Sequence, residues 1–108
     1  MVTTKKELAT NIKILANVLD KKYQFELNFR NHCYLRIAFD AVIEDKWDAQ
    51  IQRPFVKFAN VKQLFLVYKL LQKYIIDKDQ LLADNIKSLI YRKKYAKCAQ
   101  PNLQGSLF

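Results

Sequence analysis

The hydrophobic and polar positions of this chain follow the period of an α-helix over most of its length. The first helix is predicted to begin after Thr4, because Thr4 and Glu7 form a capping box in which each side chain satisfies the other residue's backbone amide. Apolar residues at helical spacing then form the predicted buried face of this helix: Leu8, Ile12, Leu15 and Leu19.

A second helix is predicted to be capped by Asn31. It should end between Asp45 and Arg53, because the residue before a proline, here Pro54, is disfavoured in helical geometry. Its predicted buried stripe consists of Leu35, Ala38, Phe39 and Val42.

Two more helices follow. The third is predicted to begin at Asn60, with Gln63 as its capping partner. Its predicted buried residues are Val61, Leu64, Phe65, Tyr68, Leu71 and Ile75. The fourth is capped by Asp77 or Asp79, and its predicted buried residues are Leu82, Ile86, Leu89 and Ile90.

Residues 22–29 break the helical period, because Tyr23, Phe25, Leu27 and Phe29 alternate with polar neighbours as in a strand. A partner strand could come only from the stretch Phe55–Phe58, and Pro54 would hold such a strand to an edge. The insert is therefore predicted to be irregular and aromatic, with room for a short two-stranded ribbon.

Composition supports a helical fold. Glycine occurs once and proline twice, whereas tight β-hairpins need residues that accept positive φ. An apolar share of 51% is sufficient for one core. We therefore predict a mainly α fold, a four-helix bundle in a basic helical domain of residues 1–98, followed by a tail of residues 99–108.

The charge narrows the range of partners. The net charge is +9, and no acidic residue follows Asp84. Such an excess attracts polyanions, and nucleic acid is the expected one. No apolar stretch is long enough for a signal peptide or a membrane span, and the two cysteines have no metal-site or redox spacing. A cytoplasmic location without membrane contact is expected.

Cations interleaved with aromatic residues indicate a DNA or RNA interface, in which the cations meet phosphates and exposed rings stack on unpaired bases. The competing interpretation is that the rings fill the core and the lysines are ordinary solvated surface. The candidate nucleic-acid-binding residues are Arg30, Arg36, Arg53, Lys87, Arg92, Lys93, Lys94 and Lys97.

Catalytic chemistry has little support in the sequence. His32, Asp40 and Glu44 could form a metal site only if they converged in one pocket, and a metal site needs three or four such ligands. His32 and Cys33 are adjacent on a helix and so point in different directions. A chain with one glycine cannot supply a phosphate-binding loop. We assign no catalytic residue, metal or cofactor, and favour a protein that is not an enzyme.

The last five residues are Gln104-Gly105-Ser106-Leu107-Phe108. They resemble the peptide by which bacterial polymerases and repair proteins dock on the β sliding clamp, usually Gln-Leu-Ser/Asp-Leu-Phe. The resemblance implies that Leu107 and Phe108 enter an apolar pocket, that Gln104 makes hydrogen bonds at its entrance and that Ser106 is part of the peptide. Gly105 departs from the usual leucine. The alternative is that the tail folds back onto the helices.

Two functional hypotheses follow. The preferred one is a small DNA-associated accessory protein of replication or repair whose tail docks on a sliding clamp. The alternative is a helical adaptor or inhibitor that binds an acidic protein partner and has no direct role on nucleic acid.

Overall fold

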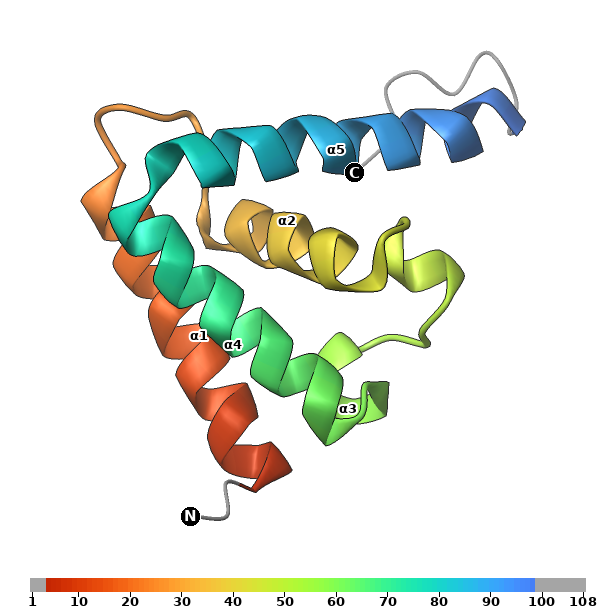
Figure 1. Ribbon diagram of the computed structural model, residues 1–108, viewed down its shortest axis with the longest axis horizontal. Helices are drawn as coiled ribbons and strands as arrows, with labels where there is room; N and C mark the ends of the chain where they lie inside the picture. The colour runs from red at the N-terminus through yellow and green to blue at the C-terminus, as the bar shows by residue number, and fades with distance from the viewer. Residues whose placement is uncertain (1–3, 99–108) are drawn as a thin grey trace.

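The computed structural model describes residues 4–98, with side chains described as far as Lys94, and shows a mainly helical protein (Figure 1). This confirms the prediction of a mainly α protein. In chain order the elements are α1 (Lys5–Lys22), α2 (Asn31–Ile43), the short 3-10 helix η1 (Trp47–Ala49), α3 (Phe55–Phe58), α4 (Val61–Ile76) and α5 (Lys78–Cys98).

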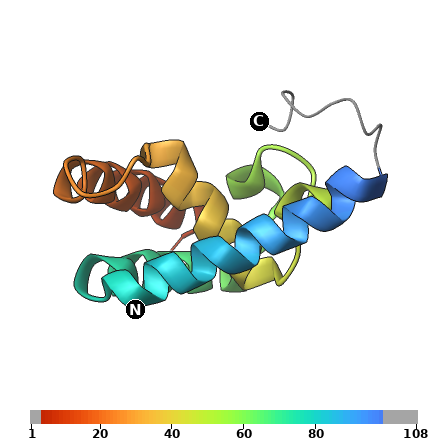
Figure 2. The ribbon, with the colours of Figure 1, turned by 90° about the horizontal axis from the view of Figure 1, so that it is seen from above.

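The four long helices pack in pairs. Helices α1 and α4 lie side by side, and α2 contacts both of them. Helix α5 turns away from the end of α4 and packs over α2, as Figures 1 and 2 both show. In both views the C-terminal turns of α5 extend beyond α2.

The predicted capping residues explain where two of the helices begin. The hydroxyl of Thr4 accepts a hydrogen bond from the backbone N–H of Glu7 at 3.1 Å, and the Glu7 carboxylate accepts one from the N–H of Thr4 at 3.0 Å. Asn60 and Gln63 form the same reciprocal pair at the start of α4. These two capping boxes are confirmed, and each satisfies backbone N–H groups that have no partner within the helix.

The ends of α2 differ from the prediction. Arg30 is its N-cap and makes no side-chain capping bond, while Asn31 is the first helical residue and donates a hydrogen bond to Asn17 on α1. The helix stops at Ile43 because Glu44 adopts a left-handed conformation with φ 60° and ψ 36°. A non-glycine residue in that region ends a helix regardless of any later proline.

The cap of the last helix is Asp77, one of the two predicted candidates. Its carboxylate accepts the backbone N–H of Gln80 at 3.0 Å, and its own N–H closes α4 on the carbonyl of Lys73 at 2.8 Å. One residue thus ends α4 and starts α5, so the change of direction between these helices needs no glycine.

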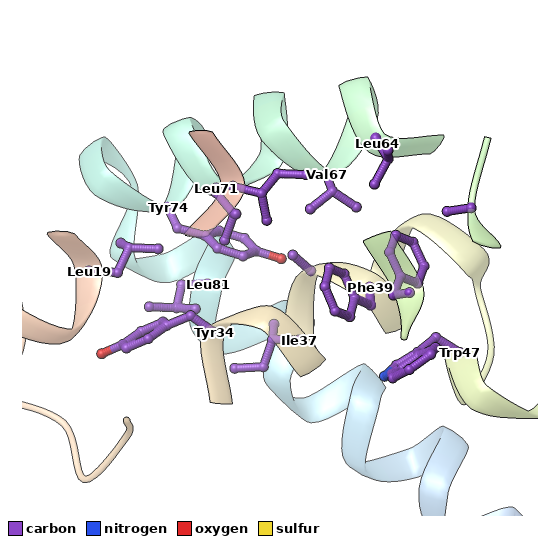
Figure 3. Close-up of a cluster of buried hydrophobic side chains, with 14 of the residues drawn as sticks. Leu19, Tyr34, Ile37, Phe39, Trp47, Leu64, Val67, Leu71, Tyr74 and Leu81 are labelled. Carbon is purple, nitrogen blue, oxygen red and sulfur yellow. The ribbon is translucent and has the colours of Figure 1, made fainter. Parts of the chain in front are cut away.

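The buried face of α1 follows the sequence pattern, with Leu8, Ile12 and Leu19 in the core. The face of α4 is rotated by about one position from the prediction: Val67 and Tyr74 are buried, whereas Phe65 is exposed. Apolar residues surround much of α4, so its pattern is compatible with more than one inward face. Figure 3 shows the side chains that α4 directs toward α2: Leu64, Val67, Leu71 and Tyr74.

The two-stranded ribbon is a wrong prediction. Residues 23–26 form a turn that closes α1, and Phe25 is 93% exposed, so the apolar alternation there does not mark a buried strand. Phe55–Phe58 is the one-turn helix α3, and no strand occurs within residues 4–98. Phe55 instead stacks on Phe39 with ring centroids 4.0 Å apart, and Trp47 meets Phe55 edge-on at 5.5 Å.

The inward face of α5 was also wrongly predicted. Ile86 and Ile90 are 59% and 61% exposed, and the residues that face the core are Leu81, Asp84 and Ser88. The reason is that the polar side chains of α5 find hydrogen-bond partners on α2 and α4, which removes the cost of burying them.

Candidate binding surface on helix α5

The contact between α2 and α5 is polar. Asp40 of α2 is fully buried and accepts hydrogen bonds from both Nε and Nη2 of Arg92, at 2.9 and 3.1 Å. The Ser88 hydroxyl donates to the same carboxylate at 2.5 Å, and the backbone N–H of Trp47 does so at 2.9 Å. Such a bidentate, fully bonded pair is the geometry in which a buried charge is tolerated.

Arg36 crosses the same contact one turn before Asp40. Its Nη2 donates to the carboxamide oxygen of Asn85 at 2.6 Å. Burial, together with the nearby positive charge of Arg92, lowers the pKa of the Arg36 guanidinium. We refer to Arg36, Asp40, Asn85, Ser88 and Arg92 as the polar seam.

A second buried polar contact holds the start of α5 against α4. The Tyr74 hydroxyl donates to Asp84 at 2.6 Å, and Gln80 donates to the other oxygen of Asp84 at 2.9 Å. Burial and the hydrogen bond to Asp84 raise the pKa of Tyr74 well above its ordinary value. The inner side of α5 is therefore fixed by hydrogen bonds on two neighbouring helices.

The outer side of α5 carries two kinds of exposed residue. Ile86, Leu89 and Ile90, which we call the apolar stripe, are each at least 44% exposed. Lys87, Lys93 and Lys94, which we call the α5 lysines, are also exposed. No acidic residue follows Asp84 in the sequence to balance them.

The candidate nucleic-acid-binding residues therefore separate into groups. The α5 lysines lie together on one helix, and the side chain of Lys97 lies outside the described residues. Arg92 is only 16% exposed and is committed to Asp40, so it holds α5 in place and does not present its charge to a ligand. Arg36 also lies in the polar seam, where its Nη2 is bonded to the neutral side chain of Asn85.

The two remaining arginines lie outside α5. Arg30 precedes α2, is exposed and stands 3.9 Å from Asp20. Arg53 pairs with Asp48 and lies over the Trp47 ring, 5.3 Å from its centroid. Each is held near an acidic residue of its own neighbourhood, so the structure does not join them to the α5 lysines.

The residues considered for catalysis do not converge. His32 and Glu44 are exposed near opposite ends of α2, while Asp40 is buried against Arg92. Within the described residues, no group of three or more His, Cys, Asp or Glu side chains could hold a metal ion. The candidate clamp-binding residues Gln104, Ser106, Leu107 and Phe108 lie outside the part of the chain that the structure describes.

The polar seam was not predicted from the sequence, although a signal was present. Asp84, Ser88 and Arg92 recur every four residues and so share one face of a helix. A polar face at that spacing can be solvated or buried, and only the position of Asp40 on another helix decides between the two.

Comparison with known proteins supplies no relative: no protein-family model, no curated protein and no solved structure matches this chain. Among the described residues, none of the helices has both the length and the apolar character needed to cross a membrane.

Proposed function

We propose that this is a small cytoplasmic protein with a helical-bundle domain that associates with DNA in replication or repair and docks on a sliding clamp through its C-terminal tail. The proposal rests on the lysines that are exposed on the outer side of α5. These lysines lie in the acid-free part of the chain, directly before the tail.

The burial of acidic residues strengthens the basic character of the surface. Of the ten acidic residues, Asp40 and Asp84 are buried and hydrogen-bonded, so they contribute little negative potential outside the protein. The exposed lysines, in contrast, are distributed over the surface and along α5. Lysine ammonium groups at such positions bind phosphates and release counterions from DNA, without reading the base sequence.

The tail would add a second contact. Its resemblance to clamp-binding peptides assigns Leu107 and Phe108 to an apolar pocket and Gln104 to hydrogen bonds at the pocket entrance. A clamp encircles duplex DNA, so a protein that touches both gains affinity from the effective concentration of the second site. Burial of the Leu-Phe pair is worth about 1.5–3 kcal/mol per residue before ordering costs, which suits micromolar binding.

The clamp contact is tested by titrating a fluorescently labelled bacterial clamp with the full chain and with a version lacking residues 104–108. We expect micromolar binding of the full chain and a loss of at least tenfold on truncation. A matched control replaces Asn102 and Gln100 by serine and leaves the last five residues intact, so it should bind as the full chain does. Equal binding of full and truncated chains, or binding by neither, would contradict the clamp contact.

The DNA contact is tested separately by fluorescence anisotropy with a labelled duplex. Several phosphate contacts predict that affinity falls steeply between about 50 and 200 mM salt. A flat salt dependence, or no binding at the lower concentration, would rule out this part of the proposal.

A second function, an adaptor that binds an acidic protein partner without touching DNA, is favoured by the apolar stripe. Ile86, Leu89 and Ile90 lie beside cations on α5, and exposed apolar residues of this kind mark protein interfaces more often than phosphate-binding surfaces. This alternative predicts no salt-dependent retention on DNA.

A further inference from the structure

The contact between α2 and α5 opens into a cavity of about 440 Å³. Its lining includes the polar side chains of Arg36, Asn85 and His32 and the apolar side chains of Phe29 and Leu89. The cavity thus brings a guanidinium together with apolar side chains, a combination suited to a ligand that has one anionic group on an apolar body.

Arg36 has no ion-pair partner among the described residues, although the nearby charge of Asp40 favours its protonated form. Its Nε atom is buried without a hydrogen-bond partner, its one hydrogen bond goes to the neutral carboxamide of Asn85, and no described acidic side chain pairs with it. Asp40 lies on the same helix, but both of its oxygens are bonded to Arg92. A partly buried cation whose N–H groups are not all hydrogen-bonded favours the binding of an anion that can accept hydrogen bonds from it.

The cavity also continues into the apolar stripe. Leu89 belongs to both, since it lines the cavity and is 44% exposed. Ile86 and Ile90 lie on the adjoining side of α5, and Lys93 follows Ile86 after two helical turns. An occupant that covers the stripe would therefore have an apolar face and acidic flanks.

We propose that the cavity and the apolar stripe form one docking site for an acidic amphipathic helix of a partner protein. A glutamate or aspartate of that helix places its carboxylate against the guanidinium of Arg36, and its apolar residues cover Leu89, Ile86 and Ile90. Carboxylate and guanidinium match in a planar, two-bond arrangement. The inference deepens the adaptor function proposed above and rests on it.

Duplex DNA is the less suitable occupant of this site. Phosphates lie on a hydrated outer surface and would leave the isoleucines uncovered, whereas a helix in an apolar groove buries them at i, i+3 and i+4 positions. Charge complementarity also argues against a second copy of this chain, because each copy carries +9.

The test uses the intact protein and a labelled, end-blocked peptide of about 15 residues, since shorter helices are marginal in water. The peptide carries leucines at i, i+3, i+4 and i+7 and glutamates on the flanks, and a matched peptide has glutamine in place of every glutamate. In ¹⁵N-edited NMR spectra of the unsubstituted protein, the glutamate peptide is expected to shift the Arg36 Nε–H signal and the amides of Ile86 and Leu89.

Substitutions then separate a specific site from general attraction to a basic surface. Arg36→Gln and Ile86→Ser should each weaken the glutamate peptide about tenfold or more. The control variants Arg53→Gln and Ile14→Ser remove an exposed cation and an exposed isoleucine elsewhere, and should leave affinity within about twofold. Arg36→Lys keeps the positive charge but lacks the planar guanidinium that binds a carboxylate through two hydrogen bonds. The affinity of this variant for the glutamate peptide should therefore exceed its affinity for the glutamine peptide by much less than in the unsubstituted protein.

Four results would overturn the proposal. They are failure of the glutamate peptide to bind, equal affinity for the two peptides, equal losses in the Arg36 and Arg53 variants, and a duplex oligonucleotide that shifts the Arg36 Nε–H signal as the peptide does. The NMR measurement needs no substitution, so the proposal stays testable if Arg36→Gln fails to fold. Salt-dependent binding to DNA would contradict the adaptor function itself, whereas failure of the peptide with a protein that does not bind DNA would contradict this site alone, which distinguishes the two failures.

Discussion

The contact between α1 and α4 and the contact between α2 and α5 bury different kinds of side chain. In the first pair the buried residues are almost all apolar, such as Leu8, Ile12 and Leu71. In the second pair Asp40, Ser88 and Arg92 hold the helices through hydrogen bonds. The difference means that α5 is positioned by its polar residues, and its isoleucines are left on the surface for another molecule.

The largest expected effect comes from breaking the polar seam at Asp40. Asp40→Asn keeps the shape of the side chain but removes the charge that neutralises Arg92. We expect the free energy of unfolding to fall by about 3 kcal/mol, because the mostly buried charge of Arg92 then keeps only its longer contact with Asp48, at 4.0 Å. Urea unfolding followed by circular dichroism measures this decrease.

The matched control for that experiment is Asp79→Asn. Asp79 is exposed in the first turn of α5, where an acidic residue interacts favourably with the helix dipole. Its removal should lower the free energy of unfolding by about 1 kcal/mol or less. If the Asp40 and Asp79 variants unfold with similar free energies, the seam does not position α5.

The apolar contact between α1 and α4 should be weakened most by removing a buried apolar side chain. Leu71→Ala removes a fully buried side chain of α4 and leaves a cavity, which typically lowers the free energy of unfolding by about 2–5 kcal/mol. Leu66→Ala, at an exposed position of the same helix, is the control and should cost much less. Equal decreases for the two leucines would show that the face assigned to α4 is wrong.

Two buried tyrosines differ in whether their hydroxyl group is hydrogen-bonded, and this difference can be tested. The Tyr74 hydroxyl is bonded to Asp84, whereas the Tyr34 hydroxyl is buried with no hydrogen-bond partner among the described residues. Tyr74→Phe should therefore lower the free energy of unfolding by about 1–3 kcal/mol, and Tyr34→Phe should leave it unchanged or raise it. Both variants are compared by the same urea titration, and the reverse order would contradict the assigned hydrogen bonding.

These tyrosines also predict a decrease of stability at alkaline pH. Burial raises the pKa of Tyr34 to about 12, and the pKa of Tyr74 is raised as well, while unfolded tyrosine titrates near 10. The unfolded chain thus releases protons that the folded chain keeps, so their contribution is complete below about pH 10 and falls as the pH rises toward 12.

Urea midpoints of the unsubstituted protein and of Tyr34→Phe, measured from about pH 8 to about pH 11.5, test this prediction. Subtracting the two profiles removes the lysines, which titrate in the same range. The variant should lose less stability over this range. Identical profiles would show that Tyr34 titrates normally in the folded protein.

Much of the fold was predictable because its signals are local. Capping boxes at Thr4 and Asn60 and the cap at Asp77 depend on residues within one turn of one another, and all three are observed. The prediction of a ribbon was wrong because a ribbon depends on a partner far away in the sequence. Alternating aromatic residues specify a strand only if a partner is present, and Phe55–Phe58 forms a helix instead.

The candidate site was less predictable because its chemistry is not local. From the sequence, Arg92 resembles a surface cation beside Lys93 and Lys94. Its structural role follows from its ion pair with Asp40, which is far away in the sequence. The inward face of α5 was misassigned for the same reason, since a rule that buries apolar residues does not anticipate that Asp84 and Ser88 have buried partners.

The central claim is that the outer side of α5 is the binding surface, and charge-matched variants test it most directly. Lys87, Lys93 and Lys94 are replaced by glutamine in one variant, and the exposed lysines Lys6, Lys13 and Lys69 of α1 and α4 are replaced in the other. Both variants carry the same reduced net charge. Anisotropy titrations of a labelled DNA duplex across salt concentrations then compare them with the unsubstituted protein.

We predict that the α5 variant binds DNA more weakly and that its salt slope, the change in log affinity with log salt, decreases by about 2.7, or about 0.9 for each phosphate that a lysine no longer neutralises. The variant of α1 and α4 should keep a slope close to that of the unsubstituted protein. Equal decreases in the two variants would show that net charge alone governs binding, and would contradict the claim that α5 is the binding surface.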